Sequence, residues 1–133
     1  FLIKMKKNTI YLIISIFLIS LTSCSDDDSN SVSSKAEITV NENGNPKSGI
    51  TVYMFDSNQG PNTDFFEPFF SNKTVITESD GKATFNLQET FDLDIIDTQT
   101  TLYFGVFDEN DLPLGDTAIT IEKGETKSAT INY

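Results

Sequence analysis

The sequence predicts an all-β domain over residues 35–133, a single seven-stranded antiparallel β-sandwich. Short segments in this range alternate apolar and polar side chains with a period of two, which is typical of strands with one buried face. No segment in the range keeps a helical period, and a domain of about 100 residues can bury an adequate core without disulfides. Turn signals separate the segments at Asn43-Gly44, Asp80-Gly81 and Lys123-Gly124.

The first four expected strands lie before residue 88. Alternation of Ala36, Ile38 and Val40 with polar residues predicts the first strand. Residues 50–55 predict a second, more buried strand. The third and fourth cover residues 74–77 and 83–87, and the intervening Asp-Gly supplies the positive φ angles that a tight hairpin needs.

Three further strands follow a looser connector at residues 88–97. The fifth, at residues 102–107, places Leu102, Phe104 and Val106 on one face, and the sixth covers residues 117–122. The last runs over residues 126–133. All three continue the period-two pattern, so no second domain is expected.

Residues 5–24 have the three parts of a secretory signal peptide. Two lysines precede an uncharged, mostly apolar segment at residues 10–21, and small residues then lead to Cys24. Twelve residues cover only about 18 Å of a ~30 Å hydrocarbon core, which argues against a spanning helix. Residues 1–4 precede the first methionine and are expected to lie upstream of the natural start. The signal peptide is therefore assigned to residues 1–23.

The segment Leu21-Thr22-Ser23-Cys24 resembles the lipobox of bacterial lipoproteins. The resemblance implies that the Cys24 thiol carries a diacylglycerol and becomes the first residue after cleavage. The alternative is a free thiol in an uncleaved membrane anchor.

Residues 24–34 comprise the lipidated cysteine and a tether rich in Ser and Asp, with no apolar period and few bulky side chains. The run Ser25, Asp26, Asp27 and Asp28 resembles the acidic export signal of some Gram-negative lipoproteins. That resemblance implies display on the extracellular face of the outer membrane. The alternative is a solvated linker without sorting content.

Charge and composition exclude several function classes. The chain has 9 Lys and no Arg, against 20 acidic residues that all follow Cys24. Loss of Lys4, Lys6 and Lys7 with the signal peptide takes the net charge from −11 to −14. Such a chain repels nucleic acid and anionic lipid head groups, so the acyl chains must hold it at the membrane.

The side chains of several common catalytic centres are missing. The chain contains no His, and Cys24 is its only cysteine. Disulfides within the chain, Ser-His-Asp and Cys-His centres and His-based zinc sites are therefore unavailable. We expect no enzyme activity.

Two segments resemble carboxypeptidase-regulatory-like, or transthyretin-like, sandwich domains. Residues 44–52 (GNPKSGITV) are similar to the family's G-x-P-x-x-G-x-x-V opening, and residues 77–85 (TESDGKATF) to its T-x-x-x-G-x-x-x-F hairpin. The resemblance covers residues 36–87 and implies an immunoglobulin-like or transthyretin-like Greek key with a non-catalytic binding or scaffolding role. The chain departs from the family by a long inserted loop at residues 56–73 and by lacking a Gly-x-Tyr strand opening after Leu87.

The acidic residues between 108 and 116 are candidate calcium ligands. Asp108, Asp111 and Asp116 gather hard oxygen ligands and could hold calcium, although Leu112 and Pro113 break the EF-hand spacing. Solvated turn acids are the alternative interpretation.

A carboxylate-dependent glycoside hydrolase is a third, remote interpretation. The absence of Trp and Arg for gripping a sugar argues against it. Its candidate carboxylates are Asp92, Asp94 and Asp97, or Asp108, Glu109 and Asp111.

The inserted loop contains four phenylalanines within six residues: Phe65, Phe66, Phe69 and Phe70. A loop of this length inside a compact domain is unusual, and such loops are often functional. The rings could cap an open end of the sandwich or contact a partner. Because neighbours in each pair cannot easily both face inward, we expect one member of each pair to be exposed.

Together these features predict an outer-membrane lipoprotein whose non-catalytic β-sandwich binds or scaffolds an unknown protein or glycan. The alternative is a calcium-binding structural lipoprotein of the envelope. No cofactor is expected besides the covalent lipid on Cys24 and, in the alternative, calcium.

Overall fold

The structure is a computed structural model that describes residues 33–88 and 99–133. The expected signal peptide, Cys24, the Asp26–Asp28 run, and the carboxylates of Asp92, Asp94 and Asp97 lie outside the described residues. The described elements are β1 (Lys35–Glu42), β2 (Asn45–Pro46), β3 (Thr51–Phe55), the 3₁₀ turn η1 (Pro68–Phe70), β4 (Lys73–Ile76), β5 (Lys82–Asn86), β6 (Gln99–Phe107), β7 (Pro113–Glu122) and β8 (Thr126–Asn132).

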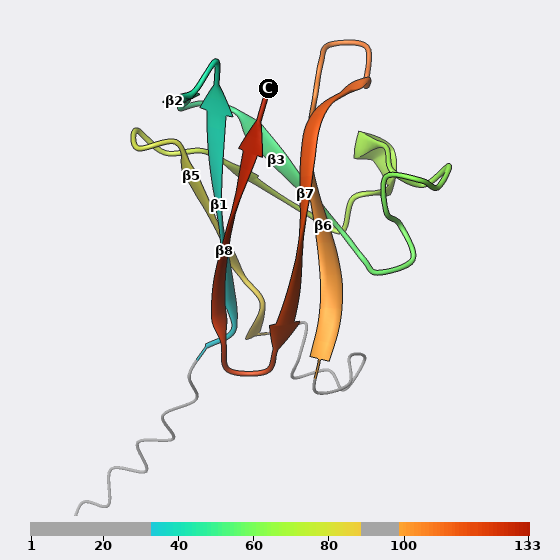
Figure 1. Ribbon diagram of the computed structural model, residues 1–133. Coiled ribbons are helices and arrows are strands. Elements are labelled where there is room, and N and C mark those ends of the chain that lie inside the picture. The colour runs from blue at the N-terminus through green and yellow to red at the C-terminus, as the bar shows by residue number, and fades with distance from the viewer. Residues whose placement is uncertain (1–32, 89–98) are drawn as a thin grey trace, which may run out of the picture. The chain divides into compact units, whose positions relative to one another are not determined.

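Two β-sheets form the domain (Figure 1). In the first sheet β1 is central, with β5 on one edge, β8 on the other, and β2 against its C-terminal end. The second sheet has the order β4-β3-β6-β7, and all of its pairs are antiparallel. The prediction of an all-β sandwich is confirmed.

Two details differ from the expected strand set. β1 and β8 pair in parallel, in a register that runs from Lys35↔Thr126 to Asn41↔Asn132. The two-residue strand β2 was not expected, because Pro46 interrupts the sequence pattern. Pro46 is tolerated there since β2 lies at a sheet edge, where a missing backbone N–H breaks no central ladder.

The core lies between the sheets and follows the period-two pattern. The side chains of Ala36, Ile38 and Val40 in β1 are fully buried, while the residues between them are half-buried. The opposite sheet contributes Leu102 and Phe104, and the ring of Phe104 packs edge-on against Phe85, with centroids 5.1 Å apart. Both sheets therefore bury one apolar face, as sandwich packing requires.

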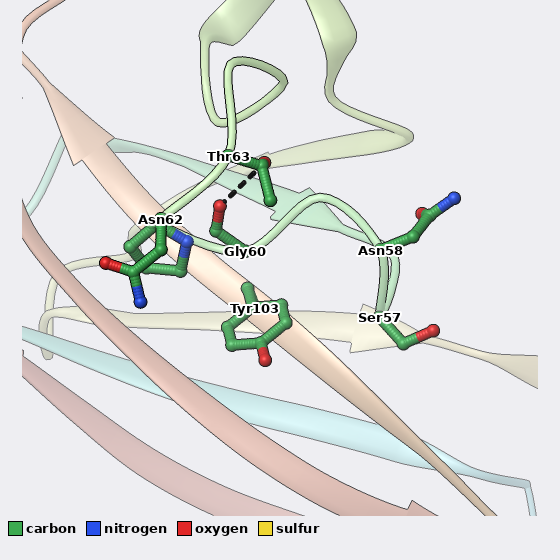
Figure 2. Close-up of a pocket in the computed structure, with 7 residues that line it drawn as sticks. Ser57, Asn58, Gly60, Asn62, Thr63 and Tyr103 are labelled. Atoms are coloured by element: carbon green, nitrogen blue, oxygen red, sulfur yellow. Dashed lines mark hydrogen bonds between the residues drawn. The ribbon is translucent and has the colours of Figure 1, made fainter.

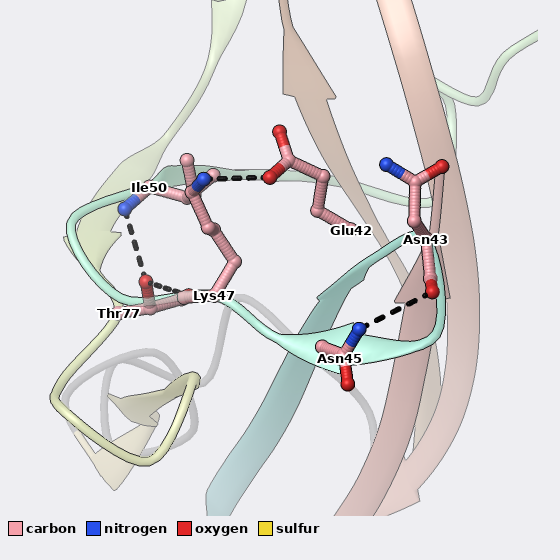
Figure 3. A network of polar contacts seen from close by, with 6 residues as sticks. All are labelled: Glu42, Asn43, Asn45, Lys47, Ile50 and Thr77. Carbon is pink, nitrogen blue, oxygen red and sulfur yellow. Dashed lines mark hydrogen bonds and ion pairs between the residues drawn. The ribbon is translucent and has the colours of Figure 1, made fainter.

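A buried hydroxyl joins the segments that precede β3 and follow β4 (Figure 3). The Oγ1 of Thr77, a residue only 4% exposed, donates to the Lys47 carbonyl at 2.7 Å and accepts from the Ile50 N–H at 2.9 Å. Gly81 lies against Pro46, with a φ of +77° and so little space that a Cβ would sit 2.8 Å from the proline Cβ. The two segments that carry the family resemblance thus pack against each other.

Lys47 and Glu42 form a surface ion pair at the same end of the sandwich. Their Nζ and Oε2 atoms are 2.6 Å apart, and this hydrogen bond, helped by the charge of Glu42, raises the pKa of Lys47 above its ordinary value. Burial raises the pKa of the nearby Tyr133 hydroxyl. Exposed pairs of this kind contribute little to stability.

Within residues 33–88 and 99–133, no helix is both long enough and apolar enough to cross a bilayer.

Candidate functional site

The second sheet carries aromatic side chains on its outer face as well as in the core. Tyr53 and Phe55 of β3 point outward, and the register Tyr53↔Gly105 and Phe55↔Tyr103 places them beside the outward residues of β6. Phe107 belongs to the same face, with its ring edge-on to Tyr53 at 5.4 Å. Gly105 lies among these residues without a side chain of its own, so the aromatic face has a gap there.

Phe66 of the inserted loop fills this gap. Its side chain is 6% exposed, and its ring lies 4.6 Å from Phe55 and 5.4 Å from Phe107, measured between centroids. A Cβ at position 105 would come within 2.7 Å of the Phe66 Cζ, so the glycine makes room for the ring. Phe66 therefore fixes the loop onto the outer face of the sheet.

Gln59 braces the two ends of the loop. Its Oε1 accepts hydrogen bonds from the Asp56 N–H at 3.0 Å and from Asn72 Nδ2 at 3.2 Å. Its Nε2 donates to the Phe70 carbonyl at 3.0 Å. The long connection is thus a compact loop closed by its own polar contacts, a type that often carries function.

The other three phenylalanines form an exposed cluster, which we call the phenylalanine patch: Phe65, Phe69 and Phe70. Phe65 is 52% exposed, Phe69 is 88% exposed and Phe70 is half-buried. The ring of Phe70 packs edge-on against both of the others, at centroid distances of 5.4 and 5.1 Å. These rings contact one another and leave most of the surface of Phe69 open to solvent.

The turn η1 sets the direction of Phe69. The Ser71 N–H and Oγ both donate to the Pro68 carbonyl, at 3.2 and 2.8 Å, and the Phe70 N–H donates to the Glu67 carbonyl at 3.0 Å. Pro68 occupies the first position of the turn, where the φ angle that its ring fixes is compatible with the helical backbone. The backbone that carries the patch is therefore held by local hydrogen bonds.

Acidic residues interrupt the patch in sequence. Asp64 and Glu67 are exposed, and among the described residues neither forms an ion pair. Residues 56–72 contain three acidic residues and no lysine. An apolar surface on this loop is thus accompanied by uncompensated negative charge.

A shallow pocket of about 160 Å³ lies at the base of the loop, beside the ring of Tyr103 (Figure 2). Thr63 Oγ1 closes one side by donating to the Gly60 carbonyl at 2.8 Å. Ser57 and Asn58 belong to the lining, but their side chains point away from Tyr103 in Figure 2. The lining contains no Asp, Glu, Lys, Arg or His side chain, and its ionisable group is the Tyr103 hydroxyl.

The predicted calcium ligands lie on two elements. Asp108 stands at the start of the β6–β7 turn, where one carboxylate oxygen accepts from the N–H groups of Asn110 and Leu112 at 2.8 and 2.9 Å. Asp111 follows in the turn with a positive φ of 61°, and Asp116 lies on the exposed face of β7. Among the described residues no three acidic, His or Cys side chains form a group that could hold a metal. Calcium binding stays a prediction, as does the hydrolase interpretation.

The four loop phenylalanines divide as their pairing suggested, with Phe66 buried beside exposed Phe65, and Phe70 half-buried beside exposed Phe69. The packing site of Phe66 was not predicted: it covers the outer face of a sheet rather than an open end of the sandwich. The sequence signal for this packing site was the aromatic character of the outward residues Tyr53, Phe55 and Phe107. When a strand has large apolar side chains at its outward as well as its inward positions, both faces of the sheet are expected to be covered.

Comparisons with known proteins show a distant likeness of fold. No family model matches the sequence, and neither does any curated protein. BcpA, the major pilin subunit of Bacillus cereus, is similar over 75% of this chain, with 13% identity and a TM-score of 0.45. Catechol 1,2-dioxygenase from Pseudomonas arvilla C-1 is similar over 81% of this chain, with 15% identity and a TM-score of 0.37.

This chain spans 29% of the pilin chain and 52% of the dioxygenase chain. At these scores and identities neither likeness bears on function. The chain is therefore assigned to a class by fold alone, that of the β-sandwich modules.

Proposed function

We propose that this chain is a surface lipoprotein whose β-sandwich is a non-catalytic binding module, with the phenylalanine patch as its contact site. The acyl chains on Cys24 hold it at the outer membrane, and the acidic run at residues 26–28 directs it to the extracellular face. The module binds a protein or a glycan and carries no cofactor besides the covalent lipid.

The observation that carries this proposal is the exposure of Phe69. A phenylalanine ring left 88% exposed, in contact with the ring of Phe70, contributes little to folding. Aromatic side chains are enriched at protein interfaces, where they supply large contact areas at low entropic cost. The non-catalytic part of the proposal is supported by the lack of His in the chain, which removes Ser-His-Asp and Cys-His centres.

The anchor is tested by labelling cells with radioactive palmitate. Wild-type protein should incorporate the label and Cys24→Ser should not, since only this thiol can form the thioether. Incorporation by Cys24→Ser equal to that of wild type would contradict the lipoprotein assignment.

Surface display is tested by adding protease to intact cells. Replacing Asp26, Asp27 and Asp28 with Ala should protect the domain while leaving its melting curve unchanged, because these positions precede residues 35–133, the range that the sequence assigns to the sandwich. A control with Ser29, Ser31 and Ser33 replaced by Ala should stay cleavable. If both variants are cleaved equally, the acidic run is only a linker.

A further inference from the structure

We infer that the phenylalanine patch enters an apolar pocket of a protein partner whose rim carries Lys or Arg side chains. This inference rests on the proposed binding function and adds the class and the charge of the partner. It follows from three properties of the loop: its shape, its charge and its chemistry.

The shape of the patch is a protrusion. Phe69 extends from a single 3₁₀ turn and is 88% exposed, while Phe70 supports it from behind. The loop behind these rings is fixed by Phe66 and closed by Gln59. A ring presented on a braced loop loses little conformational freedom on binding, and a protruding ring buries most area in a pocket.

The charge of the loop specifies the rim of that pocket. Asp64 precedes Phe65 and Glu67 stands between the two phenylalanine pairs, and both carboxylates lack an ion-pair partner in the described part of the chain. When the rings enter an apolar pocket, the carboxylates come to its edge. Cationic side chains there would complement them, whereas acidic ones would repel them.

The negative charge of the loop argues against two other binding partners of the patch, a second copy of this chain and an anionic membrane. A second copy of this chain would bring its own Asp64 and Glu67 to the contact and add a second strongly acidic chain, of net charge −11, or −14 once residues 1–23 are removed. An anionic membrane surface would repel the loop, and surface-binding segments carry Lys or Arg rather than acids beside their apolar residues.

Chemistry argues against a glycan at the patch. Sugar hydroxyls need hydrogen-bond partners, and Phe side chains offer none. The patch consists only of such rings, and the polar side chains interleaved with them are the carboxylates of Asp64 and Glu67. A protein surface supplies both the apolar pocket and the cationic rim.

The test places a photo-crosslinking residue in the patch of the full-length chain, in the cells that make it. Phe69→p-benzoylphenylalanine is irradiated on intact cells, and the adducts are identified by mass spectrometry. A second chain carries the same probe at Thr130, an exposed position on β8. Two further chains combine the probe at position 69 with charge reversal, either Asp64→Lys with Glu67→Lys or, as control, Glu78→Lys with Glu109→Lys. The two reversals change net charge equally, and all four acids are exposed.

We expect a protein adduct at position 69 that is absent at position 130, and a crosslinked partner peptide that combines apolar residues with Lys or Arg. Reversal at Asp64 and Glu67 should lower its yield at least about tenfold, and the control reversal should leave it unchanged. An adduct with a second copy, with phospholipid or with glycan would overturn the inference. A protein adduct whose yield is unchanged by the reversal at Asp64 and Glu67 would also overturn the inference, although it would leave the proposed binding function standing. The absence of any adduct at position 69 would contradict both the inference and the proposed binding function.

Discussion

Truncating Phe66 should destabilise the domain strongly, whereas truncating Phe69 should leave its stability almost unchanged. Phe66→Ala removes a ring that is 6% exposed and packs on two others at 4.6 and 5.4 Å. Burial of such a ring is worth about 2–3 kcal/mol, and its two aromatic pairs add about 0.5–1.5 kcal/mol each, which sums to about 3–6 kcal/mol. Buried Phe→Ala changes typically cost about 3–5 kcal/mol, and we expect a loss in that range. Phe69→Ala removes a ring that is 88% exposed and should change the free energy of unfolding by less than about 0.5 kcal/mol.

The assay is urea denaturation of the purified domain, followed by far-UV circular dichroism. Gly105→Ala provides an internal control, since its Cβ would lie 2.7 Å from the Phe66 Cζ and 2.9 Å from Cε2 of Phe107. That substitution alone should cost about 1–3 kcal/mol, and its cost should fall in a Phe66→Ala background, where one of the clashes is gone. If Phe66→Ala costs less than about 1 kcal/mol, or Phe69→Ala costs as much as Phe66→Ala, the assignment of anchor and patch is wrong.

Three further predictions concern the end of the sandwich shown in Figure 3. Thr77→Val should lose about 1–3 kcal/mol in urea denaturation, because the Lys47 carbonyl and Ile50 N–H lose a buried partner, whereas Thr77→Ser should lose less. Gly81→Ala should destabilise more than Gly44→Ala by the same assay: both have positive φ, but only at Gly81 would a Cβ strike Pro46. Burial should make Tyr133 ionise above its ordinary pKa of 10.0, so the stability it contributes is complete below pH 10.0 and is lost as the pH rises through the folded-state pKa. Absorbance titration of wild type against Tyr133→Phe checks this, and an unshifted difference curve would contradict it.

The strands were predictable because burial acts on every second residue. Ala36, Ile38 and Val40 turn inward, as do Leu102, Phe104 and Val106, so local alternation sufficed to locate β1 and β6. Pairing partners were not predictable in the same way, because alternation is identical in parallel and antiparallel strands. The parallel pairing of β1 with β8 joins segments about 90 residues apart, and no local signal encodes it.

The candidate site was predictable in its residues but not in its placement. Four phenylalanines in one loop were visible from the sequence, and their adjacency indicated that each pair would divide between buried and exposed members. Which member turns inward depends on Gly105, whose missing side chain leaves the gap that Phe66 fills. That contact joins positions in different elements, and only the register of β3 on β6 brings them together.

Different phenylalanine rings of this loop attach it to the sheet and form its exposed surface. Phe66 binds the loop to the sheet, so the chain can change Phe65 or Phe69 without losing the fold. The strands beneath form a platform that packs against Phe66. On the proposed binding function, the patch would be constrained by its partner rather than by the fold. Specificity would therefore reside in a few side chains of residues 64–70, three of them apolar rings and two of them carboxylates. A partner that recognises both must offer an apolar pocket and a cationic rim at once, which is a narrower requirement than either feature alone.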